Sequence, residues 1–181
     1  MRNAIRQDRG RAIRIIITGG TFDKEYDELR GELTLRRTHL PEILGQVRCT
    51  LPVELEVNQL VDSLHMDEPG RERILEVVVS SPEEMIVITH GTDTMQHTAR
   101  KLATACSTKT VVLTGAMVPY SVTGSDAVFN LGCAVAAVQL LVPGVYICMN
   151  GRVGRWDRLT KNRERGVFEE PLAAVDESTP G

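Results

Sequence analysis

Aromatic residues are scarce in this chain: one tryptophan, three tyrosines and three phenylalanines account for 4% of its 181 residues. The core must therefore be built mainly from aliphatic side chains. No long hydrophobic run stands near the start, since the apolar stretch behind the basic first twelve residues is only about five residues long. That stretch is too short for a signal-peptide core or a membrane span, so we expect a cytoplasmic protein with no membrane partner.

The chain also lacks an excess of positive charge, because 21 basic residues stand against 24 acidic ones. A net charge of −3 gives no electrostatic reason to expect a nucleic-acid partner. The four cysteines have neither the spacing of a metal site nor that of a disulfide framework. This usage favours a reducing compartment and predicts no metal site.

Two kinds of apolar segment alternate along the chain. Short β-branched runs are typical of buried strands, and longer runs with apolar residues at helical spacing are typical of helices. The alternation argues for an α/β fold, with an open, mostly parallel sheet in three layers and helices on both faces. The pattern predicts strands at 12–18, 52–60, 84–89, 110–114 and 144–149, and helices at 38–47, 67–79, 94–107 and 125–141.

Two polar stretches interrupt this alternation. Residues 22–37 are dense in charge and predict an exposed loop or a hairpin, and residues 150–168 predict a hairpin or extended loop after the fifth strand. The length suits a single domain. We expect a polar N-terminal arm at 1–11, a single folded domain at 12–168 and a loosely held tail at 169–181.

Threonine-rich turns follow two of the predicted strands. Residues 18–22 read TGGTF after the apolar run at 13–17, and residues 90–95 read HGTDTM after the run at 85–88. Ligands bind at the carboxyl ends of the strands in an open α/β sheet, so the two turns should meet in one crevice. Hydroxyls, a carboxylate and glycine amides gathered there favour an amide-hydrolysing site built on threonine.

Simpler interpretations of these turns stay open at this point. A TGGT turn is equally typical of a phosphate-binding or purely structural turn, and Asp93 or Thr94 can cap the helix that follows. His90 comes directly after a buried strand, so we expect a hydrogen-bonded structural residue rather than a base. His39 and His97 are expected at the surface.

Four short segments carry a resemblance to a known family. They are TGGT at 18–21, HGTDTM at 90–95, VVLTGAM at 111–117 with Pro119, and Ser125-Asp126 with Asn130-Leu131. In this combination and order the chain resembles the L-asparaginase/glutaminase family of bacterial and archaeal type over roughly residues 13–165. The resemblance is to a short, single-domain form that corresponds to the N-terminal domain of the family, and it implies the same α/β fold.

The resemblance also implies roles for individual residues. Thr21 matches the nucleophile, while Thr92, Asp93 and Lys161 match a second catalytic group that holds the oxyanion and moves the proton. Tyr26 matches a mobile-loop tyrosine beside the nucleophile. Ser63 matches the residue that grips the substrate's α-carboxylate. The substrate-binding residues implied are Gly20, Asp62, Ser63, Gly91, Thr92 and Asp93.

The implied function is hydrolysis of the side-chain amide of L-asparagine to L-aspartate and ammonia, through an acyl-enzyme on threonine and without a cofactor. Typical members carry a second domain, which supplies an asparagine and a glutamate to a partner subunit's site, and neither has a counterpart here. We therefore expect a homo-oligomer, a dimer or a tetramer, to cover the open side. Two alternatives stay open: an amidohydrolase acting on glutamine or another amide, and a non-catalytic amino-acid-binding module.

Overall fold

A six-stranded sheet of order β4-β1-β5-β6-β7-β8 forms the centre of the molecule. The computed structural model describes residues 12–170, so the predicted arm at 1–11 and all of the predicted tail at 169–181 except residues 169–170 lie outside the described residues. Neighbouring strands pair in parallel from β4 to β7, and β8 pairs antiparallel with β7. The strands are β1 (Ile13–Gly19), β4 (Val53–Val61), β5 (Met85–Thr89), β6 (Thr110–Thr114), β7 (Gly144–Met149) and β8 (Arg152–Arg155).

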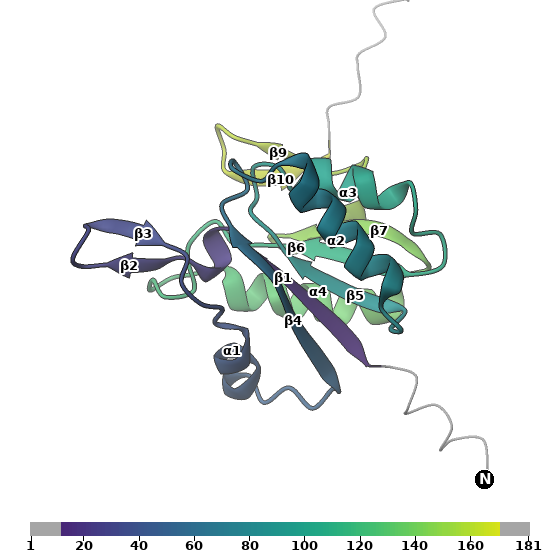
Figure 1. Ribbon diagram of the computed structural model, residues 1–181, viewed down its shortest axis with the longest axis horizontal. Helices are drawn as coiled ribbons and strands as arrows, with labels where there is room; N and C mark the ends of the chain where they lie inside the picture. The colour runs from purple at the N-terminus through teal and green to yellow at the C-terminus, as the bar shows by residue number, and fades with distance from the viewer. Residues whose placement is uncertain (1–11, 171–181) are drawn as a thin grey trace, which may run out of the picture.

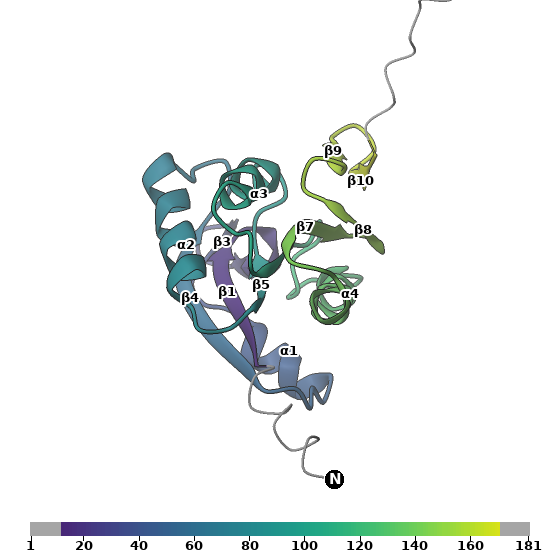
Figure 2. The same cartoon turned by 90° about the vertical axis from the view of Figure 1, so that its right-hand side faces the viewer.

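Helices cover both faces of this sheet (Figure 1). Helices α2 (Glu68–Ser80) and α3 (Met95–Ala103) pack on one face, and α1 (Leu40–Gln46) and α4 (Ala127–Leu140) lie on the other (Figure 2). The central strands are β-branched runs because they are buried on both sides, as Ile15 and Ile16 of β1 show by pointing into opposite cores. The predicted three-layer α/β fold is therefore confirmed.

The helix boundaries follow local capping. Asp67 caps α2 by accepting a hydrogen bond from the Gly70 amide at 2.8 Å. At the start of α4 the Ser125 hydroxyl accepts a hydrogen bond from the Ala127 amide at 3.1 Å. The Asp126 carboxylate does not cap this helix but accepts hydrogen bonds from the backbone amides of residues 117 and 118. The prediction that α3 continues to residue 107 is wrong: the helix ends at Ala103, where the amides of Thr104 and Ala105 donate to carbonyls only three residues earlier, at 3.2 and 3.1 Å, and tighten the last turn.

Three hairpins complete the described fold. The stretch at 22–37 resolves into a short 3₁₀ turn, η1 (Thr21–Asp23), and the hairpin of β2 (Glu25–Asp27) and β3 (Glu32–Thr34). The predicted hairpin after the fifth strand is β7–β8, with positive φ angles at Asn150 and Gly151 in its turn. A further hairpin, β9 (Thr160–Asn162) with β10 (Val167–Glu169), was not separately predicted. No helix within residues 12–170 is long and apolar enough to cross a membrane.

Candidate active site

The two threonine-rich turns meet at the carboxyl edge of the sheet, because β1 and β5 are neighbouring parallel strands. Gly20 follows β1 with φ +81°, and a Cβ added to it would overlap the backbone of Gly91. Only a residue without a side chain allows the two backbones to come this close. The glycines therefore place Thr21 and Thr92 at the same edge, as the sequence predicts.

Thr21 is the first residue of η1 and is half-buried. The turn is tight, with the Lys24 amide donating to the Thr21 carbonyl at 3.2 Å. The next side chain, Phe22, is fully buried in the core on the α4 side, and its carbonyl accepts from the Tyr120 amide at 3.3 Å. The Thr21 turn is thus anchored by the residue behind it, while Thr21 itself stays partly accessible at the edge.

Lys161 joins the second threonine turn through two hydrogen bonds. Its ammonium lies 2.8 Å from Thr92 Oγ1 and 2.9 Å from Asp93 Oδ1, with only 16% of its side chain exposed. The residue that pairs with it across the β9–β10 hairpin, Phe168, is buried in the core and holds the hairpin down. The predicted grouping of Thr92, Asp93 and Lys161 is present in the structure, although Thr21 joins neither of these hydrogen bonds.

Helix capping does not account for the HGTDTM turn. Thr94 stands at the N-cap position of α3 but makes no side-chain cap, because its hydroxyl donates to the Ser63 carbonyl at 2.8 Å. Asp93 faces Lys161 and lies 4.0 Å from Arg163. A cavity of about 190 Å³ opens beside this group. It is lined by Thr92, Asp93, Gln96, His97, Thr160, Lys161, Arg163 and Phe168, of which five were not singled out from the sequence as site residues.

The loop after β4 packs against the same edge. Ser63 is buried, and a Cβ on Gly91 would overlap its side chain. Asp62 accepts from the Leu64 amide at 2.9 Å and forms an ion pair with Lys24 at 2.5 Å. Burial raises the pKa of Asp62, but the hydrogen bond from Lys24 and that from Leu64 outweigh it and leave the pKa below its usual value.

Lys24 was missed by the sequence reasoning. It lies three residues after Thr21, and nothing in its local pattern distinguishes it from the other charges of residues 22–37. The structure shows that its ammonium ties the Thr21 turn to Asp62 of the neighbouring loop. Asp62 is therefore already paired, and the side chain of Leu64 next to it is 63% exposed.

The structure does not join Tyr26 to the other site residues. Its side chain is 65% exposed, on a hairpin that stands away from the body of the molecule (Figure 1). Side chains alternate across a strand, and in β2 it is Asp27 that turns inward, where it is held by the amides of Leu29 and Arg30. The role of Tyr26 stays a prediction.

The histidines differ from one another. His90 is fully buried, with Nδ1 2.8 Å from the Gly91 carbonyl and Nε2 2.8 Å from the Thr98 hydroxyl. Burial lowers the pKa of His90 to about 4, so the ring is neutral and structural, as predicted. The expectation that His39 lies at the surface is wrong: it is 3% exposed, because its backbone amide is held by buried Asp23. His97 is exposed, as predicted.

No group of three or more His, Cys, Asp or Glu side chains within residues 12–170 is arranged to hold a metal ion. The chemistry that the described side chains offer at this edge is that of hydroxyls, backbone amides and the Lys161–Asp93 pair.

Comparisons with known proteins agree with this geometry. The family model described as "Asparaginase, N-terminal" matches residues 12–173. The chain is 35% identical to a glutamyl-tRNA(Gln) amidotransferase subunit of Archaeoglobus fulgidus, covering 91% of this chain and 44% of that protein. It is 28% identical to an L-asparaginase of Thermococcus kodakarensis, covering 84% of this chain and 48% of that protein.

Solved structures of L-asparaginases resemble this chain over most of its length. The thermostable L-asparaginase from Thermococcus kodakarensis superposes with a TM-score of 0.73 at 26% identity, covering 88% of this chain and 51% of that chain. The chain thus spans about half the length of the relatives it matches. The match of the family model over nearly the whole sequence shows that this chain belongs to the asparaginase family, in the part that forms the family's N-terminal domain.

Proposed function

We propose that this protein hydrolyses the side-chain amide of L-asparagine to L-aspartate and ammonia, with Thr21 as the nucleophile. The observation that carries the proposal is the position of the Lys161 ammonium, shared between the Thr92 hydroxyl at 2.8 Å and the Asp93 carboxylate at 2.9 Å. A lysine held between a hydroxyl and a carboxylate at a strand edge supplies a path for a proton. A module that only binds an amino acid has no need of such a path.

In this proposal the Thr21 hydroxyl attacks the carboxamide carbon, and its proton passes toward the leaving ammonia. Backbone amides at the two glycine turns, including that of Thr92, hold the negative charge that develops on the carbonyl oxygen. The acyl-enzyme on Thr21 is then hydrolysed by a water that repeats the same steps. Lys161, in contact with both Thr92 and Asp93, relays the proton in each half of the reaction.

Substrate recognition follows from the charges around the same edge. Lys161 and Arg163 both approach Oδ1 of Asp93, so Oδ2 can receive the α-ammonium of the substrate. In this proposal Ser63, whose side chain packs against Gly91, holds the α-carboxylate. This arrangement favours amides of amino acids over simple amides.

Glutamine is the second candidate substrate. The observation in its favour is the 35% identity to the glutamyl-tRNA(Gln) amidotransferase subunit of Archaeoglobus fulgidus, which exceeds the identity to the Thermococcus L-asparaginase. Glutamine differs from asparagine by one methylene, and one methylene is worth only about 10- to 200-fold in discrimination. Both substrates therefore need to be measured.

The test is ammonia release from L-asparagine, L-glutamine and acetamide. We expect turnover of L-asparagine that falls by at least ~10²-fold in Thr21→Ala, the scale of a lost nucleophile. Thr104→Ala, an exposed threonine at the C-cap of α3, is the matched control and should keep wild-type activity. Faster turnover of glutamine would overturn the substrate assignment. Calorimetric binding of asparagine without ammonia release would instead identify a binding module.

A further inference from the structure

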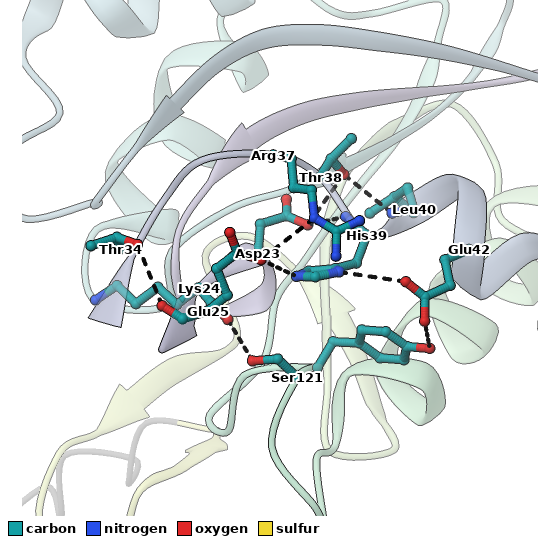
Figure 3. Close-up of polar contacts among 11 residues, drawn as sticks. Asp23, Lys24, Glu25, Thr34, Arg37, Thr38, His39, Leu40, Glu42 and Ser121 are labelled. Atoms are coloured by element: carbon teal, nitrogen blue, oxygen red, sulfur yellow. Dashed lines mark hydrogen bonds and ion pairs between the residues drawn. The ribbon is translucent and has the colours of Figure 1, made fainter. Parts of the chain in front are cut away.

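A buried histidine lies beside the Thr21 turn and takes no part in the proposed chemistry. His39 immediately precedes α1, and its side chain is 4% exposed. Neither ring nitrogen has a hydrogen-bonding partner among the described residues. Each nitrogen instead faces a carboxylate: Nε2 lies 3.9 Å from Glu25 Oε2, and Nδ1 lies 3.8 Å from Glu42 Oε2 (Figure 3).

This placement selects one protonation state of the ring. A neutral imidazole has one donor and one acceptor nitrogen, so one nitrogen lone pair would point at a carboxylate oxygen. An imidazolium carries a positive charge and has no free lone pair on either nitrogen, so that both contacts become attractive ion pairs. His39 between Glu25 and Glu42 is thus arranged as a cation that joins two anions.

The charges around the ring are unbalanced without that cation. Two carboxylates face it from separate elements, Glu25 from β2 and Glu42 from α1, and Asp23 of η1 accepts a hydrogen bond from the His39 backbone amide. Against them stands the guanidinium of Arg37, which lies 3.5 Å from Glu25. The remaining side is closed by the ring of Tyr120, with centroids 5.3 Å apart. A positive charge on His39 offsets the excess of negative charge.

His39 is also linked to the nucleophile. Asp23, two residues after Thr21, accepts hydrogen bonds from the His39 amide at 2.9 Å and from the Thr38 hydroxyl at 3.1 Å. Burial raises the pKa of Asp23, and these two bonds oppose the rise. A neighbouring contact fixes the same turn, since the Ser121 hydroxyl donates to the Lys24 carbonyl at 2.9 Å. Figure 3 shows His39 at the point where the Thr21 turn, hairpin β2–β3 and α1 converge.

We propose that His39 is a positioning residue that, as an imidazolium, ties Glu25 of the hairpin to Glu42 of α1 and so holds the Thr21 turn in place. The proposal rests on the proposed role of Thr21 as nucleophile. Because only the protonated ring makes both contacts attractive, the tie is present while His39 carries both ring protons and is lost when the ring gives one up.

The first test reads the ring and the hairpin without any substrate. Long-range ¹⁵N–¹H spectra of the histidine rings, with His39 identified from the His39→Gln variant, should show an imidazolium for His39 at pH 5.5. Amide hydrogen exchange over residues 25–34 should be about tenfold faster in His39→Gln than in the wild type at that pH, since both ion-pair contacts of the ring are lost. A neutral tautomer at pH 5.5, or equal exchange, would overturn the proposal.

The second test uses ammonia release as a function of pH. We expect kcat/KM of His39→Gln to be about tenfold below the wild type at pH 5.5, with the gap closing over the pH range in which the ring spectra show that wild-type His39 loses its second ring proton. A gap that is constant with pH would indicate a merely structural histidine and refute the positioning role. Glu76→Gln, which neutralises an exposed glutamate on α2, is the matched control and should follow the wild type at every pH.

Two other outcomes must be told apart from a failure of the His39 proposal: misfolding of the His39→Gln variant, and absence of ammonia release by the wild type. If His39→Gln does not fold, Glu42→Gln removes one of the two partners and should raise exchange over residues 25–34 at pH 5.5; unchanged exchange would refute the tie. If the wild type releases no ammonia, the proposed function fails, while the ring spectra and the exchange rates still decide the protonation state and the tie.

Discussion

The backbones of Gly20 and Gly91 are in direct contact, and this contact makes one site of two turns that are far apart in the sequence. Gly20 follows the first strand and Gly91 follows its parallel neighbour, so their approach fixes the spacing between Thr21 and Thr92. Any side chain at Gly20 would meet main-chain atoms, which cannot turn away as a flexible side chain can.

Replacement of Gly20 by alanine should therefore separate the turns. We expect Gly20→Ala to lower kcat by at least ~10²-fold, the effect of misplacing reacting groups by about 1 Å. Gly124→Ala is a close control, because Gly124 has φ +83° but no atom within 4 Å of an added Cβ. An alanine there is also strained by the positive φ, by about 1 kcal/mol or more, but it meets no clash. Equal kinetic effects in the two variants would show that the Gly20–Gly91 contact does not position the site.

The Lys161 ammonium contacts two acceptors at once, and this geometry depends on a point-like cation. An arginine keeps the charge but places it on a planar fork that reaches further. Lys161→Arg should fold normally and lose at least ~10²-fold in kcat, the scale of general acid–base catalysis. Lys101→Arg makes the same change on α3, where the side chain pairs with Glu68 and Glu72, and should keep full activity. The measurement is ammonia release, with thermal melts as the check on folding.

His90 should make stability depend on pH in a defined window. Its folded pKa is about 4, against about 6.5 for an unfolded histidine, so the unfolded chain binds the extra proton first as the pH falls. The contribution to stability is complete above pH ~6.5 and is lost as the pH falls toward 4, by about 3 kcal/mol in total. Urea unfolding between pH 4 and 7 should show this slope in the wild type, and a shallower one in His90→Gln. Parallel curves for the two proteins would contradict the prediction.

The strands and the edge of the sheet that carries the site could be predicted because their signals are local. A β-branched run buried on both faces has one structural solution, as in Ile13–Ile17, and the turn after it must lie at the carboxyl edge. The grouping of Thr92 and Asp93 with Lys161 came from the resemblance to the family. Spacing alone does not bring a lysine 68 residues away to Asp93.

What could not be predicted depends on contacts between segments that the sequence keeps apart. The burial of His39 requires Asp23, 16 residues earlier, to hold its amide. The face of the β2–β3 hairpin on which the Tyr26 side chain lies depends on the register, in which Tyr26 pairs with Leu33. A shift of one residue would move the side chain to the opposite face, so the sequence alone does not decide between the two faces. The Lys24–Asp62 ion pair likewise forms only because β1 and β4 are neighbours in the sheet.

Asn130 of α4 connects the helix to the loops on both sides of it. Its Nδ2 donates to the Gly115 carbonyl at 3.0 Å, and its Oδ1 accepts from the Asn150 amide at 2.9 Å, in a place with no exposure to solvent. Truncation leaves the buried Gly115 carbonyl without this donor and removes the side-chain partner of the more exposed Asn150 amide. A buried polar group left without a partner costs about 1–3 kcal/mol.

We therefore expect Asn130→Ala to lower the free energy of unfolding by at least about 2 kcal/mol, measured by urea titration with far-UV circular dichroism. Gln139→Ala is the control on the same helix, since the exposed Gln139 side chain bonds only to the carbonyl of Val135 one turn earlier. Its effect should stay within about 0.5 kcal/mol, as is usual for surface changes. Gly115 also lies against the His90 carbonyl, so movement of its loop should reach the HGTDTM turn. The Asn130→Ala variant should accordingly lose activity beyond its unfolded fraction, whereas a loss equal to that fraction would confine Asn130 to stability alone.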